Sequence, residues 1–317
     1  MFYGNCNKIA GLLIITLYSC TNTINKKFNP YNPYLSNYHL VFSDEFDSIS
    51  TIDINESGEP RFKWFTTPFF IASSKRNSSN ISVNNGVLTL TSNDTSVLNT
   101  NIATAMPSDN DQGWIGNAFH VGAYFEARIS FDSTQIDTSK GWPSFWSMGI
   151  EHMANKGADL CHGKANGYKH FIEDDFFEYV TASFSRENSY AATMHDWYGI
   201  YKKTCPKGFC DINNTPKGGS NFKNAFIKTS NDIDWTEFHT IGQLWIPASA
   251  DHTGYVQNYF DGKLMSTVTW DKADSLDTVP PTGNQVFNII DQSNLVLILG
   301  TGINQPLKVD WVRVWQI

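Results

Sequence analysis

Segments in which apolar and polar residues alternate recur along the chain from residue 38 onward, and turn-forming residues separate them. Such alternation, rich in β-branched and aromatic residues, is typical of half-buried strands. Asn85-Gly86 and Asp261-Gly262 each join two such segments with residues that accept the positive φ of a tight hairpin. No long segment has the 3.6-residue period of a helix. The pattern predicts strands at 81–83, 87–90, 124–131, 192–198, 239–246, 254–260, 263–270, 295–299 and 308–315.

Many short strands with turns between them predict an all-β domain of two stacked antiparallel sheets. A chain of 317 residues accommodates one such sandwich without a second core. One sheet of a sandwich can present a concave face to solvent, and a long polymer can lie across that cleft. The longest irregular stretches, 152–170 and 199–230, are expected to be loops at its rim.

The first 37 residues differ from the rest of the chain. The apolar run 9–17 follows Lys8 and is too short to span a bilayer, so it is typical of a signal peptide. It leads into Leu17-Tyr18-Ser19-Cys20, which resembles a bacterial lipobox, in which the Cys is lipidated. We therefore expect residues 1–19 to be a signal peptide and Cys20 to anchor the protein at the cell envelope. Residues 20–37 would be a disordered tether; an ordinary signal peptide followed by secretion is the alternative.

The net charge is −8, and aromatic residues make up 14% of the chain. Phosphate binding needs an excess of Lys and Arg on one face, so this charge argues against nucleic acid as a partner. The aromatic content is high enough to fill a large core and also to line a binding surface. We expect a monomer that meets a membrane only through its lipid anchor.

Three cysteines fall within the predicted domain, namely Cys161, Cys205 and Cys210. In an oxidising compartment they predict one disulfide and one unpaired thiol. Cys205 and Cys210 can close a small loop, or Cys161 can pair with either of them. The sequence leaves these pairings open.

The most informative segment is 171–179, a predicted strand that carries four acids. Side chains alternate faces along a strand, so Glu173 and Asp175 share one face. Glu178 is an odd number of residues from Glu173 and would point to the opposite face in a regular strand. One extra residue near Phe176-Phe177, a β-bulge, would bring Glu178 back to the face of the other two acids.

Neighbouring carboxylates cannot all ionise at equal cost, so their pKa values are driven apart. Retaining glycosidases use this situation: one carboxylate attacks the anomeric carbon while the other, kept protonated, donates to the leaving oxygen. The two groups must lie about 5–5.5 Å apart. A calcium-binding or simply solvated acidic strand is the alternative, although calcium sites usually draw on loops and backbone carbonyls.

Glu173-x-Asp175-x-x-Glu178 resembles the ExDxxE signature of glycoside hydrolase family 16, which includes laminarinases, lichenases, agarases, porphyranases and carrageenases. Other segments resemble further strands of this family, in the family's order: 42–46, 122–128, 141–146, 194–197, 238–263 and 309–315. The resemblance extends over nearly everything from residue 40 onward. It implies a concanavalin-like jelly-roll sandwich, with 38–317 as a catalytic domain for endo-hydrolysis with net retention.

Carried over position by position, the resemblance makes Glu173 the nucleophile, Asp175 the assisting acid and Glu178 the general acid/base. It also implies that four aromatic or imidazole side chains lie near the substrate: Trp142, Trp146, His195 and Trp197. Core packing is the alternative role for the two tryptophans Trp142 and Trp146, and a satisfied sheet histidine is the alternative for His195. No cofactor is required for this chemistry. A structural calcium is a further implication, with Glu45 and Asp310 as the nearest matching acids.

One position departs from the family pattern. Asp174 stands where the family usually has an apolar residue such as Ile or Val, because that side chain faces the space between the sheets. An acid there needs a partner or water.

The resemblance suggests a β-1,3- or β-1,3-1,4-glucan as substrate. The stretch 199–228 contains six lysines against one acidic residue, Asp211, which would favour a sulfated or otherwise anionic galactan if it folds over the cleft. A solvated surface loop is the alternative. A transglycosylase and a non-catalytic carbohydrate-binding sandwich also stay open, although binding alone would not require all three acids.

Overall fold

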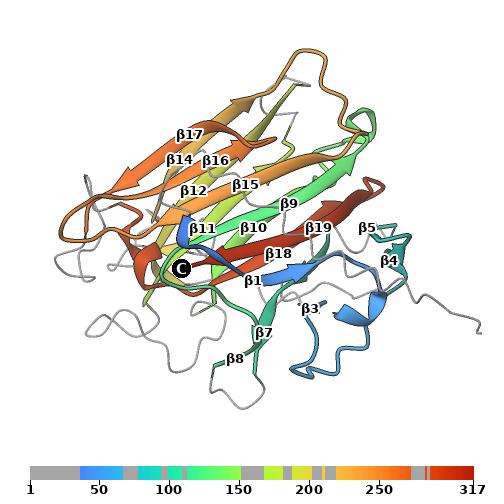
Figure 1. The fold of residues 1–317 in the computed structure, drawn as a ribbon, viewed down its shortest axis with the longest axis horizontal. Helices are drawn as coiled ribbons and strands as arrows, with labels where there is room; N and C mark the ends of the chain where they lie inside the picture. Colours follow the sequence, from blue (N-terminus) through green and yellow to red (C-terminus); the bar gives the residue numbers. More distant parts are fainter. Residues whose placement is uncertain are drawn as a thin grey trace, which may run out of the picture. The chain divides into compact units, whose positions relative to one another are not determined.

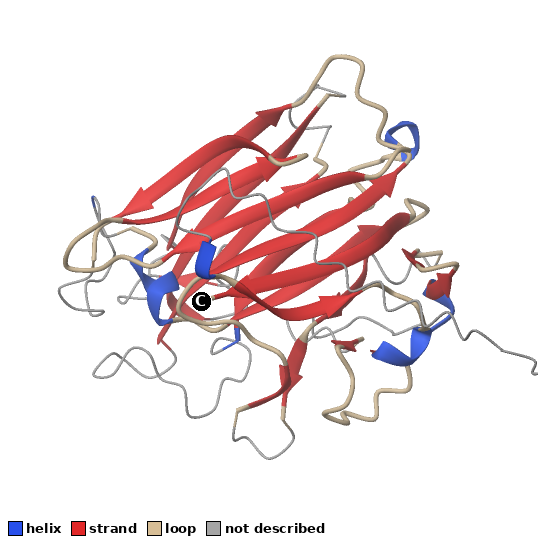
Figure 2. Cartoon of the chain, in the orientation of Figure 1, coloured by secondary structure: helices blue, strands red, loops and turns tan. Residues whose placement is uncertain are grey.

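Strands dominate the described part of the computed structural model, and the helical segments within it are short (Figure 2). The structure describes residues 36–66, 78–93, 99–108, 113–150, 168–180, 188–201, 209–210, 219–272, 283 and 286–317. The predicted signal peptide, Cys20 and all of the predicted tether except its last two residues lie outside these ranges. Within them, no helix is long and apolar enough to cross a membrane. The 3-10 turns are η2 (Ile49–Thr51), η3 (Ser78–Asn80), η4 (Ser133–Gln135) and η7 (Asn288–Gln292).

The region Tyr38–Ile317 forms one unit whose strands build two large sheets, stacked face to face (Figure 1). The eight-stranded sheet has the order β17-β16-β15-β9-β19-β5-β4, and β1 also pairs with β19. Its strands are β1 (His39–Asp44), β4 (Ile81–Asn84), β5 (Val87–Leu90), β9 (Ala123–Phe131), β15 (His239–Ile246), β16 (Gly254–Phe260), β17 (Lys263–Trp270) and β19 (Leu307–Gln316). All of these pairings are antiparallel.

The nine-stranded sheet has the order β13-β12-β11-β10-β18-β6-β3-β2, and β14 also pairs with β12. Its strands are β2 (Ile52–Asp53), β3 (Trp64–Phe65), β6 (Asn99–Ala103), β10 (Ser144–Gly149), β11 (Tyr168–Glu178), β12 (Ser189–Tyr201), β13 (Phe209–Cys210), β14 (Gly219–Lys228) and β18 (Leu295–Gly302). Only β2 and β3 pair in parallel. A separate hairpin joins β7 (Ala105–Pro107) to β8 (Trp114–Gly116).

The two predicted hairpins are confirmed. Asn85 and Gly86 have φ values of 52° and 74°, and Asp261 and Gly262 have 46° and 75°. These left-handed conformations suit Asn, Asp and Gly, and they turn the chain within two residues. The predicted strands all lie within or largely overlap observed ones.

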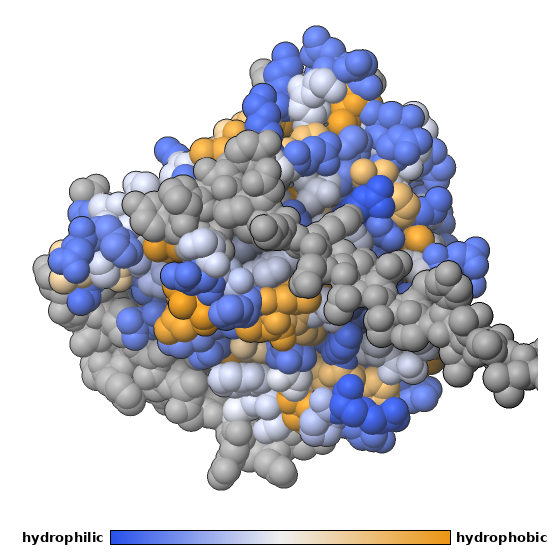
Figure 3. Space-filling view, in the orientation of Figure 1, coloured by the Kyte–Doolittle hydropathy of each residue, from blue (hydrophilic) through white to orange (hydrophobic). Residues whose placement is uncertain are grey.

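Aromatic side chains from both sheets fill the core between them. Phe125 of β9 stacks on Phe176 of β11 with ring centroids 5.3 Å apart and an interplanar angle of 11°. Trp235, which precedes β15, packs against Phe131 and Phe177 with centroid distances of 5.1 and 5.7 Å. Contacts of this kind bury large apolar areas and hold the sheets in one relative position. On the face shown in Figure 3, in contrast, polar residues predominate and apolar ones form scattered areas.

The prediction that 152–170 and 199–230 are irregular is wrong for most of the described residues in them, because 168–170 begin β11, 199–201 end β12 and 209–210 form β13. Gly219–Lys228 forms strand β14, which pairs with β12 over ten residues. Its Lys and Asn residues hid the strand from a hydropathy pattern, yet Ala225 and Ile227 alternate into the core. Polar and charged residues are common on edge strands, where they discourage pairing with other chains.

Candidate active site

A β-bulge shapes the centre of strand β11. Against β10, Phe145 pairs with Phe177 and Trp146 with Asp175, so Phe176 has no partner of its own. The same irregularity appears against β12, between Asp175 and Glu178. The bulge predicted near Phe176-Phe177 is therefore confirmed, and it turns both phenylalanines into the core.

The bulge places three carboxylates on the outer face of the nine-stranded sheet. Ile172 and Asp174 are fully buried between the sheets, so Glu173 and Asp175 point the other way. Glu178 follows the extra residue and returns to the same face, where its carboxylate hydrogen-bonds that of Asp175. Asp175 is buried at 2% exposure, whereas Glu173 and Glu178 are half-buried.

Each glutamate accepts a hydrogen bond from a tryptophan. Trp197 Nε1 donates to Glu173 Oε2 at 2.7 Å, and Trp142 Nε1 donates to Glu178 Oε1 at 2.8 Å. An indole N–H can only donate, so these contacts hold the carboxylates by their oxygens and favour the ionised form. Both tryptophans thus lie at the carboxylates and orient the acids directly, and the contact with substrate that the resemblance implies for them stays a prediction.

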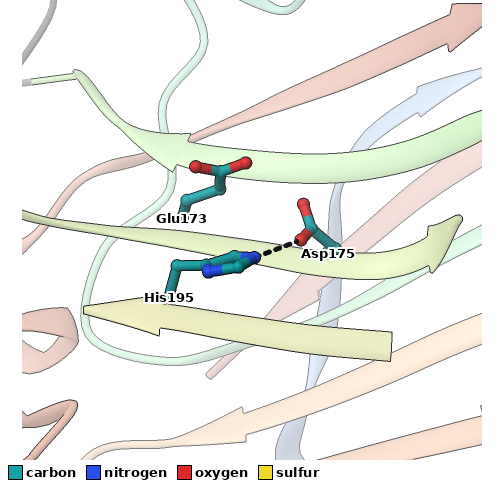
Figure 4. Close-up of side chains that lie close together, drawn as sticks. All are labelled: Glu173, Asp175 and His195. Atoms are coloured by element: carbon teal, nitrogen blue, oxygen red, sulfur yellow. Dashed lines mark ion pairs between the residues drawn. The ribbon is translucent and has the colours of Figure 1, made fainter. Parts of the chain in front are cut away.

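His195 of β12 lies over the same group (Figure 4). Its Nε2 is 3.4 Å from Asp175 Oδ2, and its ring stacks on Trp197 with centroids 5.4 Å apart. The potential metal-binding atoms of Glu173, Asp175 and His195 lie within 4.8 Å of one another, and no other such group occurs among the described residues. Glu173 already accepts a hydrogen bond from Trp197, and Asp175 is hydrogen-bonded to Glu178. These contacts explain why the side chains lie close together, so we assign no metal here.

Burial and mutual repulsion keep a proton in the carboxylate cluster. The pKa of Asp175 is raised well above its usual range, first by burial and then by the negative charges of Glu178, Glu173 and Asp174. Burial also raises the pKa of Glu178, against the opposing hydrogen bonds from Trp142 and Asp175. Asp175 and Glu178 therefore titrate as a pair that holds a proton at pH values where ordinary carboxyl groups have lost theirs.

Asp174 points into the core, as its place in the strand predicted, and there it meets a polar partner. Its Oδ1 accepts a hydrogen bond of 3.0 Å from Gln243 Nε2 on β15 of the opposite sheet. Gln243 also donates to Asn258 at 2.9 Å, and Asn258 donates to Ser266 at 2.9 Å. Burial raises the pKa of Asp174 to about 7, partly offset by the Gln243 hydrogen bond. No local pattern in the sequence identifies Gln243 as this partner.

Trp146 lies on the same outer face, next to Asp175 in the register. It is half-buried and packs against a second apolar cluster, separate from the main core, that includes Met148, Phe171 and Ile298. Trp146 therefore packs in an apolar layer that borders the carboxylates, and its contact with substrate stays a prediction.

The two acids that the resemblance relates to calcium are each engaged by an arginine. Glu45 accepts hydrogen bonds of 2.9 and 2.7 Å from Arg313, and Asp310 accepts one from Arg128. A calcium site needs about six to eight oxygen ligands whose charge is not already compensated. These two carboxylates therefore do not fit a calcium ion.

Several predictions fall outside the described residues. Cys161 and Cys205 lie there, as do four of the six lysines of the basic stretch, and only the backbone placement of Cys210 is described. Lys223 and Lys228 are exposed on β14. The disulfide pairing therefore stays a prediction.

Neither a model of a known protein family nor the sequence of a curated protein matches this chain. An endo-1,3-beta-glucanase from Streptomyces sioyaensis is similar in structure over 88% of this chain and 96% of its own, with 19% identity and a TM-score of 0.50. An endocellulase from Humicola insolens, EGI, is similar over 72% of this chain and 68% of its own, with 11% identity and a TM-score of 0.39. At such identities the likeness establishes the fold alone: the chain is a jelly-roll β-sandwich built like that of the glucanase.

Proposed function

We propose that this protein is a retaining endo-glycoside hydrolase of the family 16 type, acting on a β-linked polysaccharide. The observation that carries the proposal is the bulge in β11, which brings Glu173, Asp175 and Glu178 to one face of the sheet. A strand that merely displayed acids to solvent would need neither the bulge nor two indole donors aimed at the glutamates.

In the first step of the proposed reaction, a Glu173 oxygen attacks the anomeric carbon and the glycosidic C–O bond breaks. Glu178 donates its proton to the departing oxygen, and a covalent glycosyl ester on Glu173 remains. In the second step Glu178 takes a proton from water, the water oxygen attacks the anomeric carbon, and Glu173 is released. Asp175 shifts the pKa of Glu178 through the hydrogen bond between the two side chains. His195 lies beside Asp175.

The substrate that we place first is β-1,3- or β-1,3-1,4-glucan. The likeness to an endo-1,3-beta-glucanase supports the choice of fold, and the family resemblance supports the choice of glucan. A sulfated galactan is the second candidate, favoured by the exposed Lys228 on β14, which alternates with the core residue Ile227 and so points to the outer face.

The test is an assay for new reducing ends after incubation with laminarin, mixed-linkage β-glucan, agarose, porphyran and carrageenans. We expect one glucan to be cut by the wild type and not by Glu173→Ser. Cleavage of a sulfated galactan instead would change the assigned substrate and leave the proposed catalytic mechanism as it is. If no polymer is cut although one retards the protein in an affinity gel, the protein is a carbohydrate-binding sandwich and the catalytic assignment is withdrawn.

We also propose that the protein is exported and anchored through Cys20, on the strength of the apolar run and the lipobox-like residues before that cysteine. Cys20→Ala should move the protein from the membrane fraction to the soluble fraction of its host. Equal membrane association of both forms would exclude the anchor.

A further inference from the structure

One large aromatic side chain lies exposed on the catalytic face although no part of the reaction uses it. Phe226 of β14 has 45% of its surface exposed. Its neighbours Ala225 and Ile227 pack on the core. Because side chains alternate along a strand, the ring of Phe226 points to the outer face, on which the carboxylates lie.

The strand register puts Phe226 in line with the acid/base. Ala191 of β12 pairs with Phe226 on one side and with Glu178 on the other. The three residues therefore form one row across three strands, and Phe226 lies two strand spacings, roughly 10 Å, from the strand of Glu178. The residue between them is an alanine, so no tall side chain of the row separates the ring from the carboxylate.

On the other side of Glu178 the row continues with small residues. Ser144 pairs with Glu178, Gly300 with Ser144, and Asn101 with Gly300. A Cβ on Gly300 would lie 2.0 Å from Asn101 Oδ1, so the amide occupies the space that a side chain would take.

The row at the level of Glu173 differs. It runs through Met148 and Val296, which are buried in the outer apolar cluster. Small side chains therefore flank Glu178 on both sides along its row across the sheet. Phe226 lies at the end of this row that β14 forms.

We propose that Phe226 is the stacking platform of a remote sugar-binding subsite, and that the polysaccharide crosses Ala191 to lay the apolar face of a sugar ring on it. This inference rests on the proposed function. The exposed part of the Phe226 ring gains free energy when an apolar surface covers it, and sugar rings offer C–H groups for that contact. A subsite at this distance from Glu178 would be filled by a polymer and left empty by a short substrate.

The test compares Phe226→Ala and Phe226→Tyr with Leu264→Ala. Leu264 is a matched control, since it is 46% exposed and lies on β17 of the other sheet. Initial rates are measured on the polymer that the protein cleaves and on a short aryl β-oligosaccharide that reaches only the subsites beside the acids. We expect Phe226→Ala to raise KM for the polymer about 5-fold, since about half a Phe side chain is left to bury, with kcat nearly unchanged. Phe226→Ala should cleave the short substrate as fast as wild type does. Phe226→Tyr and Leu264→Ala should match wild type on the polymer as well.

An unchanged polymer KM in Phe226→Ala would overturn the platform. An equal loss on polymer and short substrate would overturn it too, because it would show a structural defect. If no polymer is cleaved, retardation in affinity gels decides: weaker retention of Phe226→Ala than of Leu264→Ala supports the platform although the hydrolase assignment has failed. Equal retention, or none for the wild type on any gel, rejects it.

Discussion

Trp142 Nε1 lies 2.8 Å from Glu178 Oε1 and donates a hydrogen bond to it. This bond lowers the pKa of Glu178 against the effect of burial. Trp142→Phe removes the donor and keeps the ring, so the pKa of Glu178 should rise. The alkaline limb of the profile of kcat/KM against pH should then move upward by about one pH unit. An unchanged limb would mean that the indole does not act on the proton donor.

Trp197 is the counterpart at the other glutamate, because its Nε1 donates to Glu173 Oε2 at 2.7 Å. A nucleophile must be ionised, and the lost donor makes its charge harder to hold. Trp197→Phe should therefore lower kcat by about 10-fold and leave the alkaline limb of the profile where wild type has it, since the indole of Trp197 donates to Glu173 and not to the proton donor. Trp142→Phe is the matched control, because it changes the donor to the other glutamate. A shift of the alkaline limb in Trp197→Phe would contradict the assigned roles.

Asp174→Asn should flatten the dependence of stability on pH. Burial raises the pKa of Asp174 to about 7, so between the ordinary carboxyl range and about 7 the folded protein holds a proton that the unfolded chain has lost. Stability therefore falls as pH rises through this window, by roughly 4 kcal/mol at most, and asparagine has no proton to lose.

The measurement is the free energy of unfolding in urea at pH 5 and pH 8. The advantage of Asp174→Asn over wild type should be larger at pH 8. Asp251→Asn, at an exposed position, is the control and should track wild type at both values. An equal difference at the two values would show that Asp174 does not titrate in this range.

Azide rescue separates the roles of the two glutamates. Without the carboxylate of Glu173, azide attacks the anomeric carbon directly and should give an inverted glycosyl azide with Glu173→Ala. Without Glu178 the ester still forms from a substrate with a good leaving group, and azide then opens it, so Glu178→Ala should give a retained product. NMR of the products shows the anomeric configuration, and reversed outcomes would exchange the two assignments.

Much of the fold and of the carboxylate geometry follows from local patterns. Alternation gave the strands, Asn-Gly and Asp-Gly gave the hairpins, and the odd interval between Glu173 and Glu178 required a bulge, which the register confirms. These features depend on neighbours in the sequence and on the period of a strand, so the sequence alone suffices.

What could not be predicted depends on how the two sheets stack. Gln243 is 69 residues from Asp174 in the chain, and their contact exists only because β15 and β11 face each other across the core. Strand β14 could not be predicted for a different reason. Lys223, Asn224 and Lys228 are typical of loops, although the segment pairs with β12 over ten residues. Long-range pairing overrides local propensity at such an edge.

The bulge at Phe176 also bears on how the gene can vary. Deletion of one residue between Asp175 and Glu178 would leave an even interval, so both acids would share a face on a regular strand without a bulge. A substitution of one phenylalanine by a polar residue keeps the interval and the bulge, but it puts a polar side chain into the core. Descendants of this gene can therefore lose the bulged residue and keep their acids on one face, whereas the apolar character of the residues between the acids should persist.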